Sequence, residues 1–224
     1  MISGKLTKSL LETLKSSSLM ALSKDALEVS IDQLLSDGIL KDIPIVGTIS
    51  NVFGVTNSIN NYLFTKKLLR FLYEIKDIPI GQRGKMISKI DNNIKYRNRI
   101  GEYLLFLINH CEDDTKAGLL SWGFRSFLQD KISFENFQRI ANIINHLSLI
   151  DFKDFINSDE FGEDRSIYIG CGLLFVYSDT PSIERGTEYG EPEFFVNGGE
   201  TNVCITDIGH LVKEIYKDYK YEAT

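Results

Sequence analysis

Prolines and cysteines are both scarce in this sequence. Only four prolines occur among 224 residues, so little interrupts long helices. The three cysteines, Cys111, Cys171 and Cys204, are odd in number and widely spaced, which argues against a disulfide framework or a zinc site. The first 29 residues contain no continuous apolar run of signal-peptide type. The sequence therefore predicts a cytoplasmic protein with reduced thiols.

Common signatures of catalysis and nucleotide binding are missing as well. The sequence has no GxxxxGK[ST] or GxGxxG loop, no GxSxG elbow and no HExxH pair. His110, Cys111 and Glu112 are adjacent, but consecutive helical residues point in different directions and cannot converge on one ion. We nominate no catalytic residue, no cofactor and no metal ligand, and we expect a non-enzymatic protein.

Charge is spread unevenly along the chain. Residues 151–224 contain 16 Asp/Glu and 6 Lys/Arg, a net of −10, whereas residues 1–150 contain 15 and 19, a net of +4. This step predicts two units with different surfaces, a helical domain over residues 1–157 and a small α+β domain over residues 158–224. The acidic unit is a poor match for phosphate backbones, so nucleic acid is not the expected partner.

Apolar residues recur at helical spacing through most of residues 4–157. Pro44 suits the first turn of a helix, and Ser133 is a predicted N-cap. The acidic run at 112–114 suits a helix N-terminus, where the helix dipole favours negative charge. The predicted helices cover residues 4–16, 24–36, 44–75, 82–90, 94–111, 115–130, 134–149 and 151–156.

After residue 164 the periodicity changes to that of strands. Residues 166–176 form an apolar run of strand length, and residues 193–196 and 201–206 predict a second β region. Asn197-Gly198-Gly199 is the predicted hairpin turn between them, and residues 182–188 read as a polar loop. A final helix over 207–219 would be capped by Thr206, with Gly209 permitting close backbone packing.

This order of elements predicts the fold class. The chain is expected to be mainly α, a multi-helix N-terminal domain followed by a small α+β, winged-helix-like C-terminal unit. Winged helices often bind DNA, but the net charge of −10 favours an adaptor or structural role for this one.

Residues 43–64 contain no charged side chain, and the stretch that follows, residues 66–99, is basic. A helix with one apolar face and one neutral polar face beside a cationic flank is typical of helices that lie on anionic membranes. The same periodicity fits a central helix of a bundle, so burial of this segment distinguishes the two interpretations. The predicted membrane or partner contacts are Ile45, Ile49, Val52, Phe53, Lys66, Lys67 and Arg70.

Two strings of this sequence resemble a segment of uncharacterised bacterial helical proteins: DGILKDIPIVGTISNVFG and, after it, YLFTKKLLRFLYEI. Those proteins often end in a GLL…LTxxG pattern. Here Gly172-Leu173-Leu174 and residues 205–209 stand in those positions, with Ile205 replacing the usual Leu. The resemblance covers about a third of the chain. It implies a bacterial cytoplasmic origin and a setting among mobile-element and phage-defence genes, and it identifies no catalytic residue.

Together these features predict a non-enzymatic bacterial effector or accessory protein with phage defence as its setting. It would act through the helix at 43–64 and the basic stretch at 66–99. The target would be a membrane surface or a protein partner, self-association included. The protein would be cytoplasmic or peripheral at the inner membrane. The alternative function is a winged-helix-like adaptor or transcriptional regulator.

Overall fold

The structure is a computed structural model that describes residues 2–24, 27, 42–53, 59–91, 94–158, 161, 165–188, 191–197, 199 and 201–219. Most of these residues are helical, as the sequence predicts, and the strands lie between residues 174 and 205. The helical elements are α1 (Ile2–Lys15), η1 (Ser17–Ala21), α4 (Pro44–Phe53), α5 (Ile59–Ile75), α6 (Ile80–Asp91), α7 (Ile94–His110), α8 (Asp114–Leu128), α9 (Phe134–His146), α10 (Leu149–Asn157), α11 (Ser166–Gly170) and α12 (Asp207–Tyr216).

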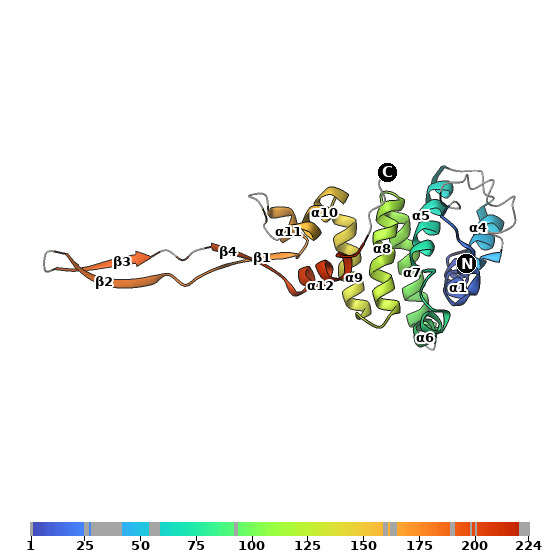
Figure 1. Cartoon of the computed structure of the whole chain (residues 1–224), viewed down its shortest axis with the longest axis horizontal. Coiled ribbons are helices and arrows are strands. Elements are labelled where there is room, and N and C mark those ends of the chain that lie inside the picture. Colours follow the sequence, from blue (N-terminus) through green and yellow to red (C-terminus); the bar gives the residue numbers. More distant parts are fainter. Residues whose placement is uncertain are drawn as a thin grey trace.

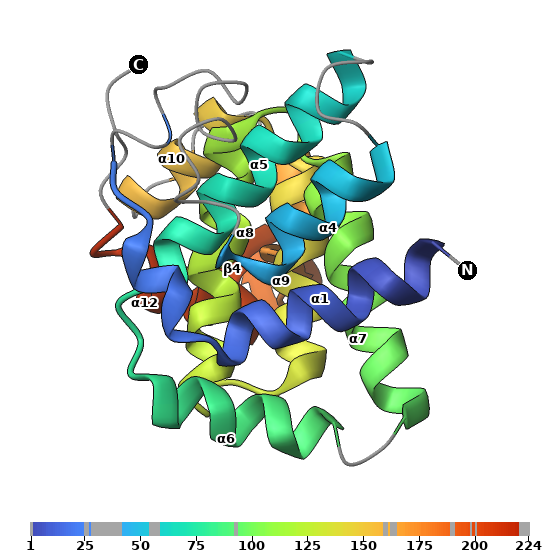
Figure 2. The same cartoon turned by 90° about the vertical axis from the view of Figure 1, so that its right-hand side faces the viewer.

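The helices pack around a continuous hydrophobic core (Figures 1 and 2). Helix α5 lies along α8, and α8 packs against α9. Phe124 of α8 joins these layers, because its ring lies 5.6 Å from that of Phe71 and 5.3 Å from that of Phe137. Each fully buried ring of this size contributes about 2–3 kcal/mol of transfer free energy.

Three of the predicted helix starts are confirmed. Helix α4 begins at Pro44, and Asp113 caps α8 by accepting a hydrogen bond from the Lys116 amide at 2.8 Å. Ser133 caps α9 by accepting from the Asn136 amide at 3.1 Å. These side chains satisfy amide groups that the first turn of a helix leaves without backbone partners.

Arg83 is fully buried and closes the C-terminal end of α1. Its guanidinium donates to the carbonyl oxygens of Leu14 at 3.0 Å and Ser16 at 3.3 Å, and to that of Ile78 at 2.9 Å. Burial lowers the pKa of Arg83 from its usual value. The positive charge lies where the last carbonyls of α1 carry partial negative charge, which favours it there.

Replacing Arg83 with Met should therefore destabilise the fold by about 3 kcal/mol, because three carbonyl oxygens lose a charged donor. The free energy of unfolding in urea measures this loss. Lys85→Met on the same helix is the matched control, since Lys85 is exposed, and it should shift that free energy by less than about 0.5 kcal/mol. Equal stabilities for the two variants would contradict the role given to Arg83.

The strands form one long antiparallel ribbon. Strand β1 (Leu174–Ser178) pairs with β4 (Thr201–Ile205), and β2 (Ser182–Glu188) pairs with β3 (Glu191–Asn197). The register passes from one pair of strands to the other without a slip, because equal numbers of residues separate Ser178 from Ser182 and Asn197 from Thr201. At this length the ribbon extends about 45 Å. Figure 1 shows it projecting away from the helices.

Gly199 is required where the two halves of the ribbon meet. A Cβ atom built on this residue would overlap the carbonyl oxygen of Asp179, which lies in the opposite segment between β1 and β2. Any other side chain would force the two backbones apart at this point. The glycine-rich sequence here thus serves close strand approach within the ribbon.

The prediction of one strand over residues 166–176 is wrong in its first half. Residues 166–170 form the short helix α11, and its Tyr168 packs between Phe155 and Phe161. The first part of this apolar run is therefore helical, and only its last residues enter β1. The expected placement of Cys171 on a strand fails for the same reason, because Cys171 lies in the turn after α11.

The predicted hairpin turn at residues 197–199 is also wrong. Strands β3 and β4 do not pair with each other, and residues 182–188, expected to be a polar loop, form strand β2. The polar residues of β2 concealed it, because residues 182–188 lack the alternation of apolar and polar side chains that indicates a half-buried strand. The predicted helix over 24–36 lies outside the described residues, except for Lys24 and Leu27.

The final helix returns to the body. Helix α12 packs on α8, α9 and α10, and the Tyr216 hydroxyl donates to the carbonyl of Leu119 at 2.7 Å. The indole of Trp122 donates to the carbonyl of Ile215 at 2.7 Å. Residues on both sides of the predicted boundary at 157 therefore contribute to one hydrophobic core.

Candidate functional site

The first part of the uncharged segment packs against the core through its apolar residues. Ile45 and Ile49 are buried where α4 packs on α1, and the Ile45 amide donates to the hydroxyl of Thr13 at 2.9 Å. Val52 and Phe53 are the last residues of α4, and their side chains lie outside the described part of the chain. The two apolar contacts that can be placed are therefore unavailable to a membrane or partner in this structure.

The other end of the segment is exposed. At the start of α5, Ile59 is 79% exposed, and Tyr62 and Leu63 are also accessible. These three side chains directly precede Lys66 in the sequence. None of the described helices combines the length and apolar content needed to cross a bilayer.

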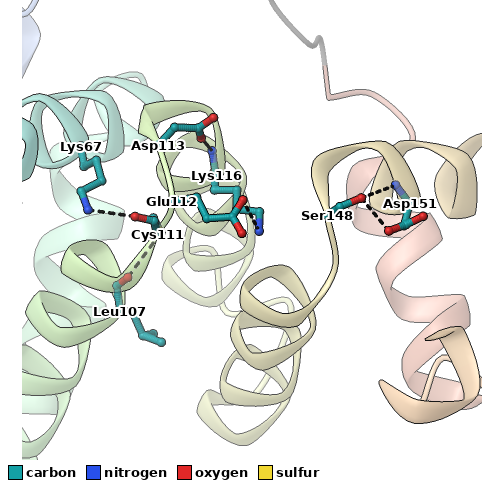
Figure 3. A network of polar contacts seen from close by, with 8 residues as sticks. All are labelled: Lys67, Leu107, Cys111, Glu112, Asp113, Lys116, Ser148 and Asp151. Atoms are coloured by element: carbon teal, nitrogen blue, oxygen red, sulfur yellow. Dashed lines mark hydrogen bonds and ion pairs between the residues drawn. The ribbon is translucent and has the colours of Figure 1, made fainter.

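Two lysines of α5, Lys66 and Lys67, contact the chain where α7 ends and α8 begins. Lys67 donates to the carbonyl oxygen of Cys111 at 2.8 Å, at the C-terminal end of α7 (Figure 3). It also donates to the carbonyl oxygen of Asn109 at 2.6 Å. The adjacent Lys66 lies 3.2 Å from Asp114, in the first turn of α8. Lys67 places positive charge at the C-terminal end of a helix, where the helix dipole favours it, and the charge of Lys66 is neutralised by a carboxylate.

Arg70, the third predicted cation, is nearly buried and pairs with Glu74 at 2.8 Å. The three cations therefore contact groups of the chain itself. The structure does not bring the five described residues of this set together on one surface, because two are in the core, Lys66 and Lys67 contact the α7–α8 corner, and Arg70 pairs within α5.

The cluster at residues 110–114 is part of the same corner. The Cys111 thiol is buried and donates to the carbonyl of Leu107 at 3.3 Å. Burial raises the pKa of Cys111 to about 12, even though Lys67 and Lys116 favour the thiolate. A neutral thiol is a poor nucleophile and a poor metal ligand. Glu112 pairs with Lys116 at 3.0 Å (Figure 3), and within the described ranges no three His, Cys, Asp or Glu residues are placed to hold a metal ion.

The turn that ends α11 fixes the first strand, β1, at the base of the ribbon. Gly172 adopts φ +78°, and the following Leu173 amide donates back to the carbonyl of Tyr168 at 2.9 Å. This left-handed glycine with a backward hydrogen bond is a standard way to end a helix. It turns the chain so that Leu173 and Leu174 enter the core before β1 leaves it.

Thr206 fixes the second strand at the same point. Its hydroxyl donates to the carbonyl of Gly172 at 2.7 Å and accepts from the Gly209 amide at 3.0 Å, which caps α12. A Cβ on Gly209 would lie 2.5 Å from the carbonyl oxygen of Leu173. The predicted roles of Thr206 and Gly209 are confirmed, and both strands are thereby attached to the body.

Beyond this attachment the ribbon exposes large apolar side chains. Phe175, Val176 and Tyr177 are 46%, 46% and 43% exposed. Phe175 and Tyr177 lie on one face of β1, with ring centroids 6.1 Å apart, and Val176 lies on the other. Sequence reasoning missed this surface because an apolar strand run normally indicates burial. Nothing in the sequence marks this run as exposed.

The ribbon is also acidic. Residues 174–205 contain six Asp/Glu and one basic residue, Arg185. Each strand of the ribbon pairs with one neighbour only among the described residues, so each also presents an edge of backbone groups. The ribbon thus combines exposed aromatic rings, negative charge and available strand edges.

A pocket of about 360 Å³ lies beside the ribbon's base. His146 and Arg139 of α9 line it together with Cys171 and Ile208. Burial, and then the charge of Asp151, raises the pKa of Cys171. The thiol is consequently neutral near pH 7, and the pocket lacks an activated nucleophile.

Comparison with known proteins adds no relative. No family model matches the chain, and neither a curated protein nor a solved structure matches it. Function is therefore inferred from the placement of the residues. The ribbon is the feature best suited to contact another molecule.

Thr206→Val should destabilise the protein by about 1–2 kcal/mol, because it removes the cap of α12. Thr206→Ser keeps the hydroxyl and should stay within about 0.5 kcal/mol of the natural protein. Urea unfolding followed by circular dichroism measures both. A valine variant as stable as the serine variant would show that the hydroxyl does not attach the ribbon.

Proposed function

We propose that the protein is a non-enzymatic interaction protein that binds a partner protein through its β ribbon. The observation that carries this proposal is the projecting ribbon with Phe175, Val176 and Tyr177 exposed at its base. Clustered, exposed apolar residues are typical of protein-binding surfaces. Aromatic side chains are common among the residues that dominate binding energy.

The attachment of the ribbon also supports binding. Gly172, Thr206 and Gly209 fix both strands at the base, so little rigid-body freedom remains there to be lost on association. The resemblance of the N-terminal segment to bacterial helical proteins places this role in an effector or accessory protein, with phage defence as the setting. That part of the proposal depends on the resemblance alone.

Immobilised full-length protein should capture a specific partner from extracts of its source cells, measured by quantitative mass spectrometry. Phe175→Ser combined with Tyr177→Ser should reduce capture at least about tenfold, since both exposed rings would be lost. The matched control combines Phe106→Ser and Ile150→Ser, which are exposed elsewhere on the body, and it should capture as much as the natural protein. Equal capture by the ribbon variant would contradict the proposal.

A membrane surface is the second candidate. The supporting observation is the exposed start of α5, where Ile59, Tyr62 and Leu63 adjoin the basic stretch. Such a site could bind a bilayer peripherally through apolar insertion and attraction to anionic headgroups. The burial of Ile45 and Ile49 makes this candidate weaker, because insertion of α4 would require the helix to separate from α1.

For this candidate, full-length protein should float with vesicles of phosphatidylglycerol and phosphatidylcholine in a density gradient. Ile59→Asp with Leu63→Asp should abolish flotation, because two carboxylates would oppose both insertion and attraction to anionic lipid. Ile150→Asp, an exposed residue of α10, should leave it unchanged. Absence of the natural protein from the lipid fraction would exclude the membrane candidate.

The alternative of a winged-helix-like adaptor or regulator has narrower support. A β-hairpin that leads directly into a capped helix is shared with winged helices, and α12 follows β4 in this way. Six acidic residues against one basic residue in 174–205 weigh against DNA as the ligand. A protein-binding adaptor is consistent with the main proposal, whereas a DNA-binding regulator is not.

A further inference from the structure

Charge is separated along the long axis of the molecule. Residues 42–99, which include α4, α5 and α6, contain ten Lys/Arg and four Asp/Glu, a net of +6. Residues 174–205 have a net charge of −5. Figure 1 shows the ribbon at one end of the molecule and α4, α5 and α6 at the other, and Figure 2 views that second end directly. The chain segments at the two ends therefore have formal net charges of opposite sign, while Arg83 of the basic segment is buried and Lys66 pairs with Asp114.

The two ends also share exposed apolar residues. The ribbon presents Phe175 and Tyr177, and the opposite end presents Ile59 and Leu63 of α5 with Ile80 of α6. A surface with apolar residues and negative charge complements one with apolar residues and positive charge. Charge of opposite sign steers association, and apolar contact then stabilises the complex.

We propose that the partner of the ribbon is a second copy of this chain, bound head to tail at its basic end. This inference rests on the proposed function, because it names the partner of the same ribbon. The ribbon of one copy would lie against the α4–α6 end of the next copy. Pairing of ribbon with ribbon is disfavoured, since it would bring together two segments of net charge −5.

A head-to-tail contact joins two different surfaces. A pair joined in this way would keep one ribbon and one basic end free for further copies. Repetition of such a contact produces a closed ring or an open chain rather than a single symmetric dimer. The expected assemblies therefore grow with protein concentration beyond two copies unless a ring closes.

Sedimentation velocity of the full-length protein tests this proposal. Oligomers should form at micromolar concentration in about 50 mM NaCl and weaken about tenfold or more in about 500 mM NaCl, because salt screens charges at this distance. Ile59→Ser with Leu63→Ser should also weaken association, since it removes apolar contact from the basic end. A monomer at every salt and protein concentration would overturn the proposal.

A variant that lacks three ribbon carboxylates tests the contribution of the ribbon more specifically. Glu184→Gln, Glu188→Gln and Glu193→Gln together remove three negative charges from the ribbon. The matched control, Asp154→Asn, Glu214→Gln and Asp218→Asn, removes three from exposed positions of α10 and the α12 end. The ribbon variant should associate at least about tenfold more weakly than the natural protein, and the control should associate at least as strongly. Equal behaviour of the two variants would show that net charge, and not the ribbon, governs association.

The outcome also separates this inference from the proposed function. If the protein stays monomeric while the Phe175→Ser, Tyr177→Ser variant loses a captured cellular protein, the ribbon binds another partner and self-association is wrong. If both assays are unaffected by ribbon variants, both proposals are wrong. If capture from extracts yields only this chain and oligomers dissolve in salt, the second copy is the partner.

Discussion

The position of the ribbon depends on a close backbone contact between two parts of the chain. Helix α12 begins against the carbonyl of Leu173, and only a glycine at 209 leaves room for that approach. Thr206 adds its hydroxyl to the same point, so one residue caps α12 and holds the carbonyl of Gly172. Because the two strands are fixed here, a ribbon without a hydrophobic core of its own can extend from the body. A two-stranded ribbon is marginal by itself in water, so this attachment to a packed body is what it requires.

The basic residues after position 65 illustrate how charge can serve two purposes. Lys67 and Arg83 donate to carbonyl oxygens at the ends of α7 and α1, and Lys66 pairs with Asp114. These contacts stabilise helix ends. Carbonyl groups are dipoles and leave the charges of Lys67 and Arg83 in place, whereas Asp114 neutralises that of Lys66. The net positive charge of residues 42–99 therefore persists around the basic end. A structural role for a cation and a contribution to the field of the molecule are compatible.

The helices and their caps could be predicted because each depends on local sequence. Ser133, Asp113 and Thr206 act within three residues of their positions, and the apolar spacing of α8 and α9 is evident without tertiary information. The ribbon could not be predicted in the same way. The pairing of Leu174 with Ile205 joins residues far apart in sequence, and the polar composition of β2 resembles that of a loop. Likewise, periodicity identified the amphipathic character of 43–64 but could not tell that Ile45 faces α1 while Ile59 faces solvent.

The negative charge of the ribbon opposes the pairing of its exposed strand edges with those of other ribbons. Two long edges with unpaired backbone groups can pair with any similar edge, which leads to aggregation. Six carboxylates against one guanidinium over residues 174–205 oppose pairing between ribbons of the same kind, since each would repel the other. The same charge does not oppose a cationic surface. A ribbon of this composition therefore opposes pairing with other ribbons, and the partner proposed for it carries positive charge.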